Sequence, residues 1–436
     1  MKNPGVVIIG LGATTPLGLT TEQTWQGLCQ GECGIGPIEA FDPAGFACKI
    51  AGQVQEFKIR DYIPKSVRKT TKLMSRDIEL AILAALQAFQ NSGLITKAID
   101  EENVNINPSR TAINIGAGLI SCDLVELAPA VAKSITDGKF DILKWGKDGL
   151  EAVTPLWLLK YLPNMLACHI GIIHDIQGPS NTITCAEAAG QLAIGEAVEI
   201  IIRGDADLAL AGGGESKVNP IVMLRQCLLK RATENNVEPK KSCRPFDVNA
   251  SGSVFGEAAA MVVLENAEMA KARGAKIYAQ IAGFGQSNSL NSEYEKLEPD
   301  GKGLQIAIEK AISQAGIKPG ELDLIIPHGT GIPYDDKAEA TALQNILGDA
   351  AEKIPVFPTK SMLSNTGAAA GALDVVIAAI AMNESKIPAA KNCDEKFDGC
   401  KLNISNTEQN REIRYALCCS YTYGGQTAAI VLKKVE

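Results

Sequence analysis

The sequence is poor in the features that build metal sites, membrane spans and nucleic-acid surfaces. Only three histidines occur among 436 residues, and the twelve cysteines form no CxxC pair, so we expect no metal site and reduced thiols. No apolar run of about 18 residues is apparent, and no signal-peptide pattern follows the first methionine; we therefore expect a cytoplasmic protein without a membrane span. A formal net charge of −8 argues against nucleic-acid binding.

Linkers, charge blocks and low-complexity tracts are also missing, which predicts two fused halves that share one core. A hydrophobic content of 46% and a charged content of 21% are typical of a globular protein with a large core. One basic run, KSVRKTTK at residues 65–72, could attract an acidic partner or could simply be a solvated face.

Short apolar runs alternate with longer helical patterns, which is typical of a layered α/β fold. In the first half we predict strands at residues 6–9, 111–115, 208–211 and 259–264, and helices at 76–91 and 187–203. A similar series follows, with strands at 276–283 and 322–326, helices at 303–315, 336–347 and 368–382, and a closing hairpin of 415–419 and 428–432. We expect a duplicated architecture with its site at the seam, and an insertion at about 120–180 that covers the site or a partner subunit.

Cys185 is the candidate nucleophile. It lies in NTITCAEAAG, residues 181–190, where a strand pattern changes to a long helical one. A cysteine at this junction faces free backbone N–H groups and the positive end of a helix dipole, which favours the thiolate. Glu187 places a carboxylate in the first turn, where it interacts well with the dipole but could raise the pKa of the thiol.

Three further segments carry candidate partners for Cys185. His328 ends an apolar strand, where catalytic groups collect in parallel sheets, although a lone histidine there is often structural. Asn365 lies in a polar loop before a small-residue helix and could donate an amide hydrogen bond to a substrate oxygen; tight helix packing explains the small residues equally well. Lys360 could tune the charge of the site, and Glu339 could anchor it. The run SYTYGGQT at residues 420–427 is typical of a hairpin turn.

Taken in order, these segments resemble the β-ketoacyl-acyl-carrier-protein synthases of the thiolase-like fold, especially the type II elongating enzymes, over nearly the whole chain. Further landmarks of that family are VIIGLGATTPLG at residues 7–18, GDAD at 204–207, AGGGE at 211–215, RPFD at 244–247 and FGE at 255–257. The resemblance implies duplicated βαβαβ halves in a five-layer αβαβα sandwich. Residues 1–270 would form the half that carries Cys185, and residues 271–436 the half that carries His328 and Asn365.

The resemblance also implies a reaction and its participants. Cys185 would take an acyl chain from an acyl carrier protein as a thioester, and a malonyl-carrier would then lose carbon dioxide and attack it to give a 3-oxoacyl product. The backbone N–H groups of Cys185 and Tyr423 would form the oxyanion hole. His328, Lys360 and Glu339 match the family histidine, lysine and glutamate. No permanent cofactor is implied, because phosphopantetheine arrives on the carrier, and a homodimer is expected.

Departures from the family pattern concern the same site. The second family histidine is replaced by Asn365, so the site is Cys-His-Asn, as in the chain-initiating type III synthases; an amide can act there only as a neutral donor. The family's HGTST becomes HGTGI, which keeps Thr330 as a pantetheine-binding residue and places Ile332 where the second threonine would be. The gating phenyl ring becomes Tyr423, and we expect Tyr421 to belong to the same gate.

Two other functions stay open for this sequence. A non-condensing partner subunit, similar to chain-length factors, would explain the loss of the second histidine, but such partners generally lose the nucleophile. An initiating synthase that uses acyl-coenzyme A would fit Asn365, but not the elongating-type landmarks.

Overall fold

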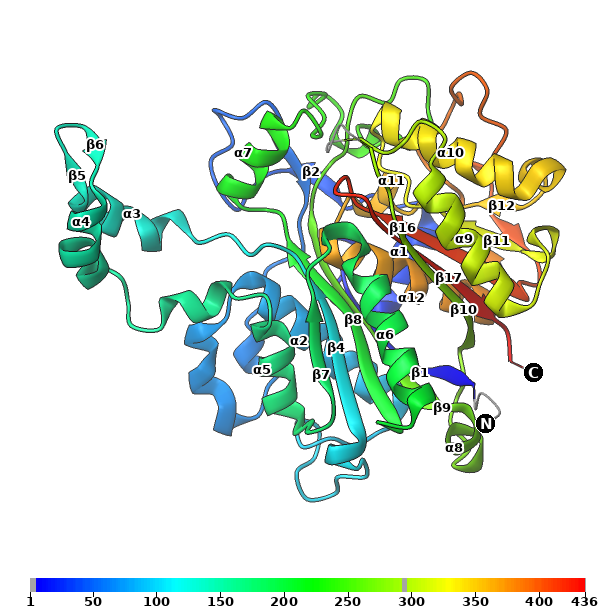
Figure 1. Cartoon of the computed structure of the whole chain (residues 1–436), viewed down its shortest axis with the longest axis horizontal. Coiled ribbons are helices and arrows are strands. Elements are labelled where there is room, and N and C mark those ends of the chain that lie inside the picture. The colour runs from blue at the N-terminus through cyan, green and yellow to red at the C-terminus, as the bar shows by residue number, and fades with distance from the viewer. Residues whose placement is uncertain (1–4, 292–295, 436) are drawn as a thin grey trace.

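The computed structural model describes residues 5–291 and 296–435 (Figure 1). One large sheet runs through the molecule, and its strands are β1 (Val6–Thr14), β4 (Thr111–Ala117), β7 (Ser180–Ile183), β8 (Leu208–Ser216), β9 (Glu257–Asn266), β10 (Ala279–Asn288), β11 (Leu324–Ile326), β12 (Pro355–Val356), β14 (Asn403–Ile404), β16 (Tyr415–Tyr421) and β17 (Gln426–Lys433). Three small two-stranded pairs lie outside it: β2 (Ile35–Pro37) with β3 (Ile50–Gly52), β5 (Ile135–Thr136) with β6 (Lys139–Phe140), and β13 (Lys386–Ile387) with β15 (Gln409–Asn410).

Helices lie on both faces of this sheet and in segments that project from it (Figure 1). They are α1 (Thr21–Gln30), α2 (Arg76–Ser92), α3 (Leu124–Lys133), α4 (Ile142–Lys144), α5 (Met165–His174), α6 (Ala189–Arg203), α7 (Pro220–Leu228), α8 (Ala267–Ala272), α9 (Lys302–Ala315), α10 (Pro333–Leu347), α11 (Lys360–Leu363) and α12 (Ala370–Glu384).

The strand order repeats itself. The first half has the order β7-β4-β8-β9-β1, and the second half has the equivalent order β12-β11-β16-β17-β10, with β14 added at its outer edge. In both halves the strands toward the outer edge pair in parallel and the inner ones antiparallel. The halves join through a short antiparallel pairing of Val7 and Ile8 with Gln280 and Ala279. The two series predicted from the sequence are therefore one continuous eleven-stranded sheet.

The layers follow from which helices contact which strands. Helix α2 packs on β1, β8 and β9, and α9 packs on β10 and β17, so these helices form the outer layers. Helices α6 and α12 contact each other and lie between the halves, with α6 on β4 and β8 and α12 on β9 and β16 (Figure 1). This αβαβα arrangement is the five-layer sandwich that the resemblance implied.

Helix α12, a middle-layer helix, is apolar over almost its whole surface, with Asp374 as a buried exception. Nearly every residue from Ala370 to Met382 is buried, because sheets cover the helix from both sides. Within the described residues, the segment Gly367–Glu384 is the one helix long and apolar enough to cross a membrane, contrary to the expectation that no such run exists; 83% of it is buried inside the fold. Its composition is that of a core helix.

Strand β1 is longer than predicted, because it continues from Val6 to Thr14 through glycines that the sequence suggested as its end. A Cβ atom at Gly12 would lie 2.0 Å from the carbonyl oxygen of Ala84, and one at Gly10 would lie 2.3 Å from that of Ala88. These glycines therefore allow the backbone of α2 to approach the strand.

The predicted insertion at 120–180 is only partly an insertion. Helix α5 packs on α2 and β4 and belongs to the outer layer, and β7 is the edge strand of the sheet. Helices α3 and α4 with the β5–β6 hairpin instead project from the body as an arm (Figure 1). The hairpin of β16 and β17 turns at Gly424 and Gly425 as predicted.

Candidate active site

Cys185 lies in the turn between strand β7 and the middle-layer helix α6. A single 3₁₀ turn, Ala186–Ala188, follows it and runs directly into α6. Ala186 has φ 42°, a left-handed conformation that is costly for a residue with a side chain and is common at functional sites. The sharp turn presents the sulfur at the helix N-terminus.

Burial raises the pKa of the Cys185 thiol above its usual value. This direction is opposite to the one expected from the helix dipole, because the site removes the thiolate from water. Burial is the cause of this shift, and the expected effect of Glu187 on the thiol pKa stays a prediction. Burial therefore favours the thiol form of Cys185.

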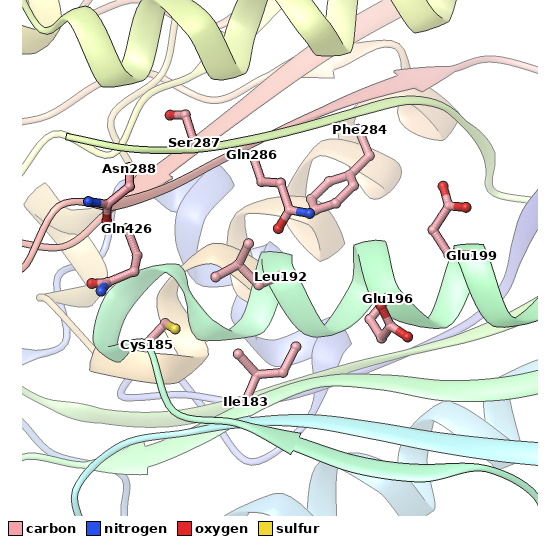
Figure 2. Close-up of a pocket in the computed structure, with 10 residues that line it drawn as sticks. All are labelled: Ile183, Cys185, Leu192, Glu196, Glu199, Phe284, Gln286, Ser287, Asn288 and Gln426. Carbon is pink, nitrogen blue, oxygen red and sulfur yellow. The ribbon is translucent and has the colours of Figure 1, made fainter.

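A cavity of about 450 Å³ opens beside Cys185 and follows α6 (Figure 2). Cys185 lies at one end of it, and Glu196, Glu199 and Phe284 lie at the other. Its lining residues are Ile183, Cys185, Leu192, Glu196, Glu199, Phe284, Gln286, Ser287, Asn288 and Gln426. The cavity therefore draws on β7, α6, β10 and β17, and apart from Cys185 it contains no residue of the predicted site.

His328 lies just beyond strand β11, in a loop held by Glu339 of α10. The backbone N–H groups of His328 and Gly329 donate to the two carboxylate oxygens of Glu339 at 2.6 and 2.7 Å. Burial, with the cations Lys360 and Arg231, holds the pKa of His328 well below its usual value, so its imidazole is neutral. Its ring packs edge-on against Tyr421 at 4.4 Å between centroids.

Lys360 begins helix α11 and is fully enclosed. Its Nζ lies 3.3 Å from Oδ2 of Asp374 on α12, and the side chains are 2% and 1% exposed. The Thr359 hydroxyl donates to the other oxygen of Asp374 at 2.6 Å. Lys360 therefore acts on His328 through its charge and not through a hydrogen bond.

Asn365 follows α11 and is completely buried. Its side-chain Nδ2 donates to Oε1 of Glu187 at 3.4 Å, and its Oδ1 accepts from the N–H of Gly367 at 3.1 Å. The contact with Glu187 brings Asn365 to the turn that carries Cys185, two residues before Glu187. The 3₁₀ turn after Cys185 also packs against the start of the α12 segment and against β16.

Glu187 belongs to a buried ion cluster that the sequence analysis missed. Lys217, after strand β8, lies 4.0 Å from Glu187 and 3.1 Å from Glu215. Burial opposes ionisation of Glu187, but Lys217 and Arg231 outweigh it and hold its pKa below the usual value. Arg231 in turn pairs with Asp335 at 2.7 Å. A lysine directly after a buried glycine-rich strand was the available signal.

The sequence suggests Glu339 as an anchor of the site, and in the structure it is fully buried beside the His328 loop. Burial raises its pKa to about 8, although two backbone N–H groups and the Tyr421 hydroxyl at 3.4 Å donate to it. Its contacts make it an anchor for the His328 loop.

The residues expected to form the gate or to bind substrate are Tyr421, Tyr423, Thr330 and Ile332. The Tyr421 side chain is 1% exposed and packs on His328, and its expected place in a gate stays a prediction. Thr330 is fully buried and its hydroxyl donates to Asp336 at 3.2 Å; its expected contact with pantetheine stays a prediction. Ile332 is the buried N-cap residue of α10. Tyr423 is half-buried in the β16–β17 turn and lies under the guanidinium of Arg231 at 4.9 Å.

The sequence predicts that the backbone N–H groups of Cys185 and Tyr423 form an oxyanion hole, which requires that neither donates to another protein group. Within residues 5–291 and 296–435, the backbone N–H groups of Cys185 and Tyr423 donate to no other backbone or side-chain group. In the same part of the chain, no group of three or more His, Cys, Asp or Glu side chains could hold a metal ion.

Comparisons with known proteins agree with this geometry. Residues 3–270 match the β-ketoacyl synthase N-terminal domain, and residues 278–394 match its C-terminal domain. The chain is 33% identical over 439 residues to 3-oxoacyl-[acyl-carrier-protein] synthase 2 of Vibrio harveyi, covering 100% of both chains. It is 33% identical over 437 residues to the Coxiella burnetii protein of the same name, again covering 100% of both.

Solved structures give the same result. The ishigamide ketosynthase/chain length factor has a TM-score of 0.84 and 28% identity, with 99% of each chain covered. A β-ketoacyl synthase from Burkholderia phymatum has a TM-score of 0.84 and 25% identity, with 99% of this chain and 100% of that chain covered. The chain therefore belongs to the β-ketoacyl synthase family.

Proposed function

We propose that this protein is a 3-oxoacyl-[acyl-carrier-protein] synthase, an acyltransferase of fatty-acid or polyketide-like biosynthesis. One observation carries the proposal: Cys185 lies at the N-terminus of α6 and at one end of a cavity of about 450 Å³. The full-length likeness to 3-oxoacyl-[acyl-carrier-protein] synthase 2 supports the same reaction.

In the first half-reaction, the Cys185 sulfur attacks the thioester carbonyl of an acyl-carrier. The carbon–sulfur bond to the carrier breaks, and the thiol proton of Cys185 passes to the departing phosphopantetheine sulfur. The N–H groups of Cys185 and Tyr423 stabilise the tetrahedral oxyanion; one such donor is worth about 3 kcal/mol. The acyl chain extends into the cavity along α6.

In the second half-reaction, a malonyl-carrier loses carbon dioxide and leaves an enolate. The enolate carbon attacks the acyl-Cys185 carbonyl, the thioester bond breaks, and the Cys185 thiolate takes up a proton. Neutral His328 donates an N–H to the enolate oxygen, and Asn365 donates its second amide hydrogen. Both donors are uncharged, so the site stabilises the enolate by hydrogen bonds alone.

The carrier needs a docking surface, and the basic run at residues 65–72 supplies a candidate. It forms the 3₁₀ helix Lys65–Leu73, in which Lys65, Lys69 and Lys72 are exposed. Within the described residues none of these three lysines forms an ion pair. An acidic carrier protein would find unneutralised charge there.

The arm and the sheet edge support a homodimer. Val125, Ile142 and Leu143 on the arm are 80%, 67% and 81% exposed, which is unusual for apolar residues on one projecting unit. Strand β7 is the open edge of the large sheet, and Ser180 and Asn181 in it are exposed. A second copy of the chain would cover both surfaces.

Intact-mass measurement tests the function directly. Incubation with a panel of acyl-carriers should add one acyl mass to the wild-type protein and none to Cys185→Ala. Addition of malonyl-carrier should then release carbon dioxide and form the 3-oxoacyl-carrier. A parallel reaction with acyl-coenzyme A separates an initiating synthase from an elongating one. Absence of both the adduct and the carbon dioxide would contradict the proposal.

A non-condensing partner subunit is the second candidate, because Asn365 replaces the family's second histidine and one structural relative is a ketosynthase/chain length factor. The acyl adduct on Cys185 decides between the two functions, since a pure scaffold would not form it.

A further inference from the structure

The turn that carries Asn365 is held in one conformation by its backbone. The N–H of Asn365 donates to Val254 at 2.7 Å, and its carbonyl accepts from Gly256 at 3.0 Å. Ser364 before it has φ 66° and Gly367 after it has φ 60°. The backbone of Asn365 is therefore fixed, and only its side-chain amide can still rotate.

Two neighbours decide which way that amide faces. Its oxygen accepts from the N–H of Gly367, and its nitrogen donates to the carboxylate of Glu187. A flipped amide would place its NH₂ group against an N–H and its oxygen against a carboxylate, losing both hydrogen bonds. The amide nitrogen has two hydrogens, and Glu187 uses one of them.

Lys217 connects the groups that hold this turn. It lies 4.0 Å from Glu187 and 3.1 Å from Glu215, with its side chain 4% exposed and both carboxylates 2% exposed. The second oxygen of Glu215 accepts from the N–H of Ala368 at 2.7 Å. One buried cation thus lies between two carboxylates, one bound to the Asn365 side chain and the other to the turn that follows it.

We propose that Glu187 and Lys217 are positioning residues for Asn365: the Glu187 carboxylate orients the amide so that its second hydrogen faces the malonyl thioester oxygen, and Lys217 keeps that carboxylate charged. This inference rests on the proposed function. The charged groups that face Glu187 are Lys217, Glu215, Arg231 and Asp335. Removal of Lys217 leaves Arg231 as the remaining nearby cation, while the carboxylates of Glu215 and Asp335 still face Glu187. The loss of positive charge raises the pKa of Glu187 and favours its protonated form.

The test separates decarboxylation, which uses Asn365, from acylation of Cys185, which does not. Lys217→Met should slow carbon dioxide release about tenfold at pH 6, with partial recovery at pH 9, because a protonated Glu187 is a poorer acceptor. Acylation of Cys185 should change by less than about threefold. In Lys217→Met/Glu187→Gln the pH dependence should disappear, since no titrating group remains at that position.

A conservative pair of variants keeps the test valid if Lys217→Met does not fold. Glu187→Gln retains an oxygen that can accept from Asn365, and Glu187→Leu does not. The rate of carbon dioxide release should therefore fall from wild type to Glu187→Gln to Glu187→Leu, with Glu187→Leu at least about tenfold below wild type. Glu265→Gln is the matched control: Glu265 is also a buried carboxylate, paired with Arg273 at 2.9 Å, but at the far end of β9. It should leave both half-reactions unchanged.

The possible failures are distinguishable. If the wild-type protein forms no acyl adduct and releases no carbon dioxide, the proposed function is wrong. If the wild type is active and Glu187→Leu decarboxylates at the wild-type rate, the positioning role is wrong. Equal loss of acylation and decarboxylation in the variants, or a pH slope that persists in the double variant, would also overturn it, because either result indicates a structural role only.

Discussion

Replacement of Lys360 by methionine should lower the free energy of unfolding, because it leaves the buried Asp374 carboxylate without its cation. Lys360 and Asp374 are both enclosed, and their charged atoms lie 3.3 Å apart. Methionine has a similar length but no charge, so Lys360→Met leaves Asp374 as a buried carboxylate that retains only the Thr359 hydroxyl. Breaking a buried pair in this way costs about 3–5 kcal/mol of unfolding free energy.

The cost should depend on pH in a defined direction. Burial raises the pKa of Asp374 above its usual value, and Lys360 holds it down. Loss of Lys360 therefore raises that pKa further, so Asp374 is neutralised as the pH falls toward it. An acid with a raised pKa in the folded state destabilises the fold as pH rises through that value, so the deficit should be largest at pH 8 and smaller at pH 5.5.

Urea unfolding at a fixed protein concentration measures this effect. At pH 8 Lys360→Met should lose about 3–5 kcal/mol, and Lys360→Met/Asp374→Asn should recover most of the loss, because asparagine still accepts from Thr359 without a charge. Lys353→Met, at an exposed lysine without an ion pair in the described part of the chain, should change stability by less than about 0.5 kcal/mol. A deficit below about 1 kcal/mol, or one that is equal at both pH values, would refute the reasoning.

Other variants test the cavity, the thiol and the helix packing. Leu192→Trp should slow acylation of Cys185 by long acyl-carriers about tenfold or more, measured by intact mass, because Leu192 lines the cavity. The rate of acetyl transfer should stay within about threefold of wild type. Equal loss for both substrates would contradict the cavity assignment. Alkylation of Cys185 by iodoacetamide should speed up about tenfold per pH unit between pH 7 and 9, since burial raises its pKa, and a plateau below pH 8 would show a stabilised thiolate. Gly190→Ala should lose about 1–3 kcal/mol in thermal unfolding, because its Cβ would lie 2.7 Å from the Ala368 carbonyl, whereas Gly36→Ala meets nothing within 4 Å and should be near neutral.

Much of the fold was predictable because its strands and helices have strong local patterns. The repeated series of strands and helices corresponds to the repeated strand order of the sheet. The end of β1 was not predictable, because Gly10 and Gly12 are explained only by their contact with α2, more than 70 residues away. The limits of the insertion were not predictable for a similar reason: α5 joins the outer layer through its contacts with α2.

Some residues of the candidate site could also be named from the sequence, and others could not. Cys185, His328 and Asn365 could be named from their chemistry and their positions at strand and helix ends. Lys217 was missed although it directly follows a buried glycine-rich strand, because its importance depends on Glu187, which comes from the turn after β7 and reaches it only in the folded chain. The roles expected for Tyr421 and Thr330 stay predictions; in the structure their hydroxyl groups donate to Glu339 and Asp336.

The sequence by itself determined the layered α/β class, the duplicated order of elements and the reactive groups at Cys185 and His328, because these depend on local periodicity and on residue type. Only the tertiary structure decided the protonation of those groups and the orientation of Asn365. Burial raises the pKa of Cys185 against the helix dipole, and distant charges keep Glu187 ionised. Desolvation and buried ion pairs arise when remote segments come together, so they leave no pattern in a linear sequence.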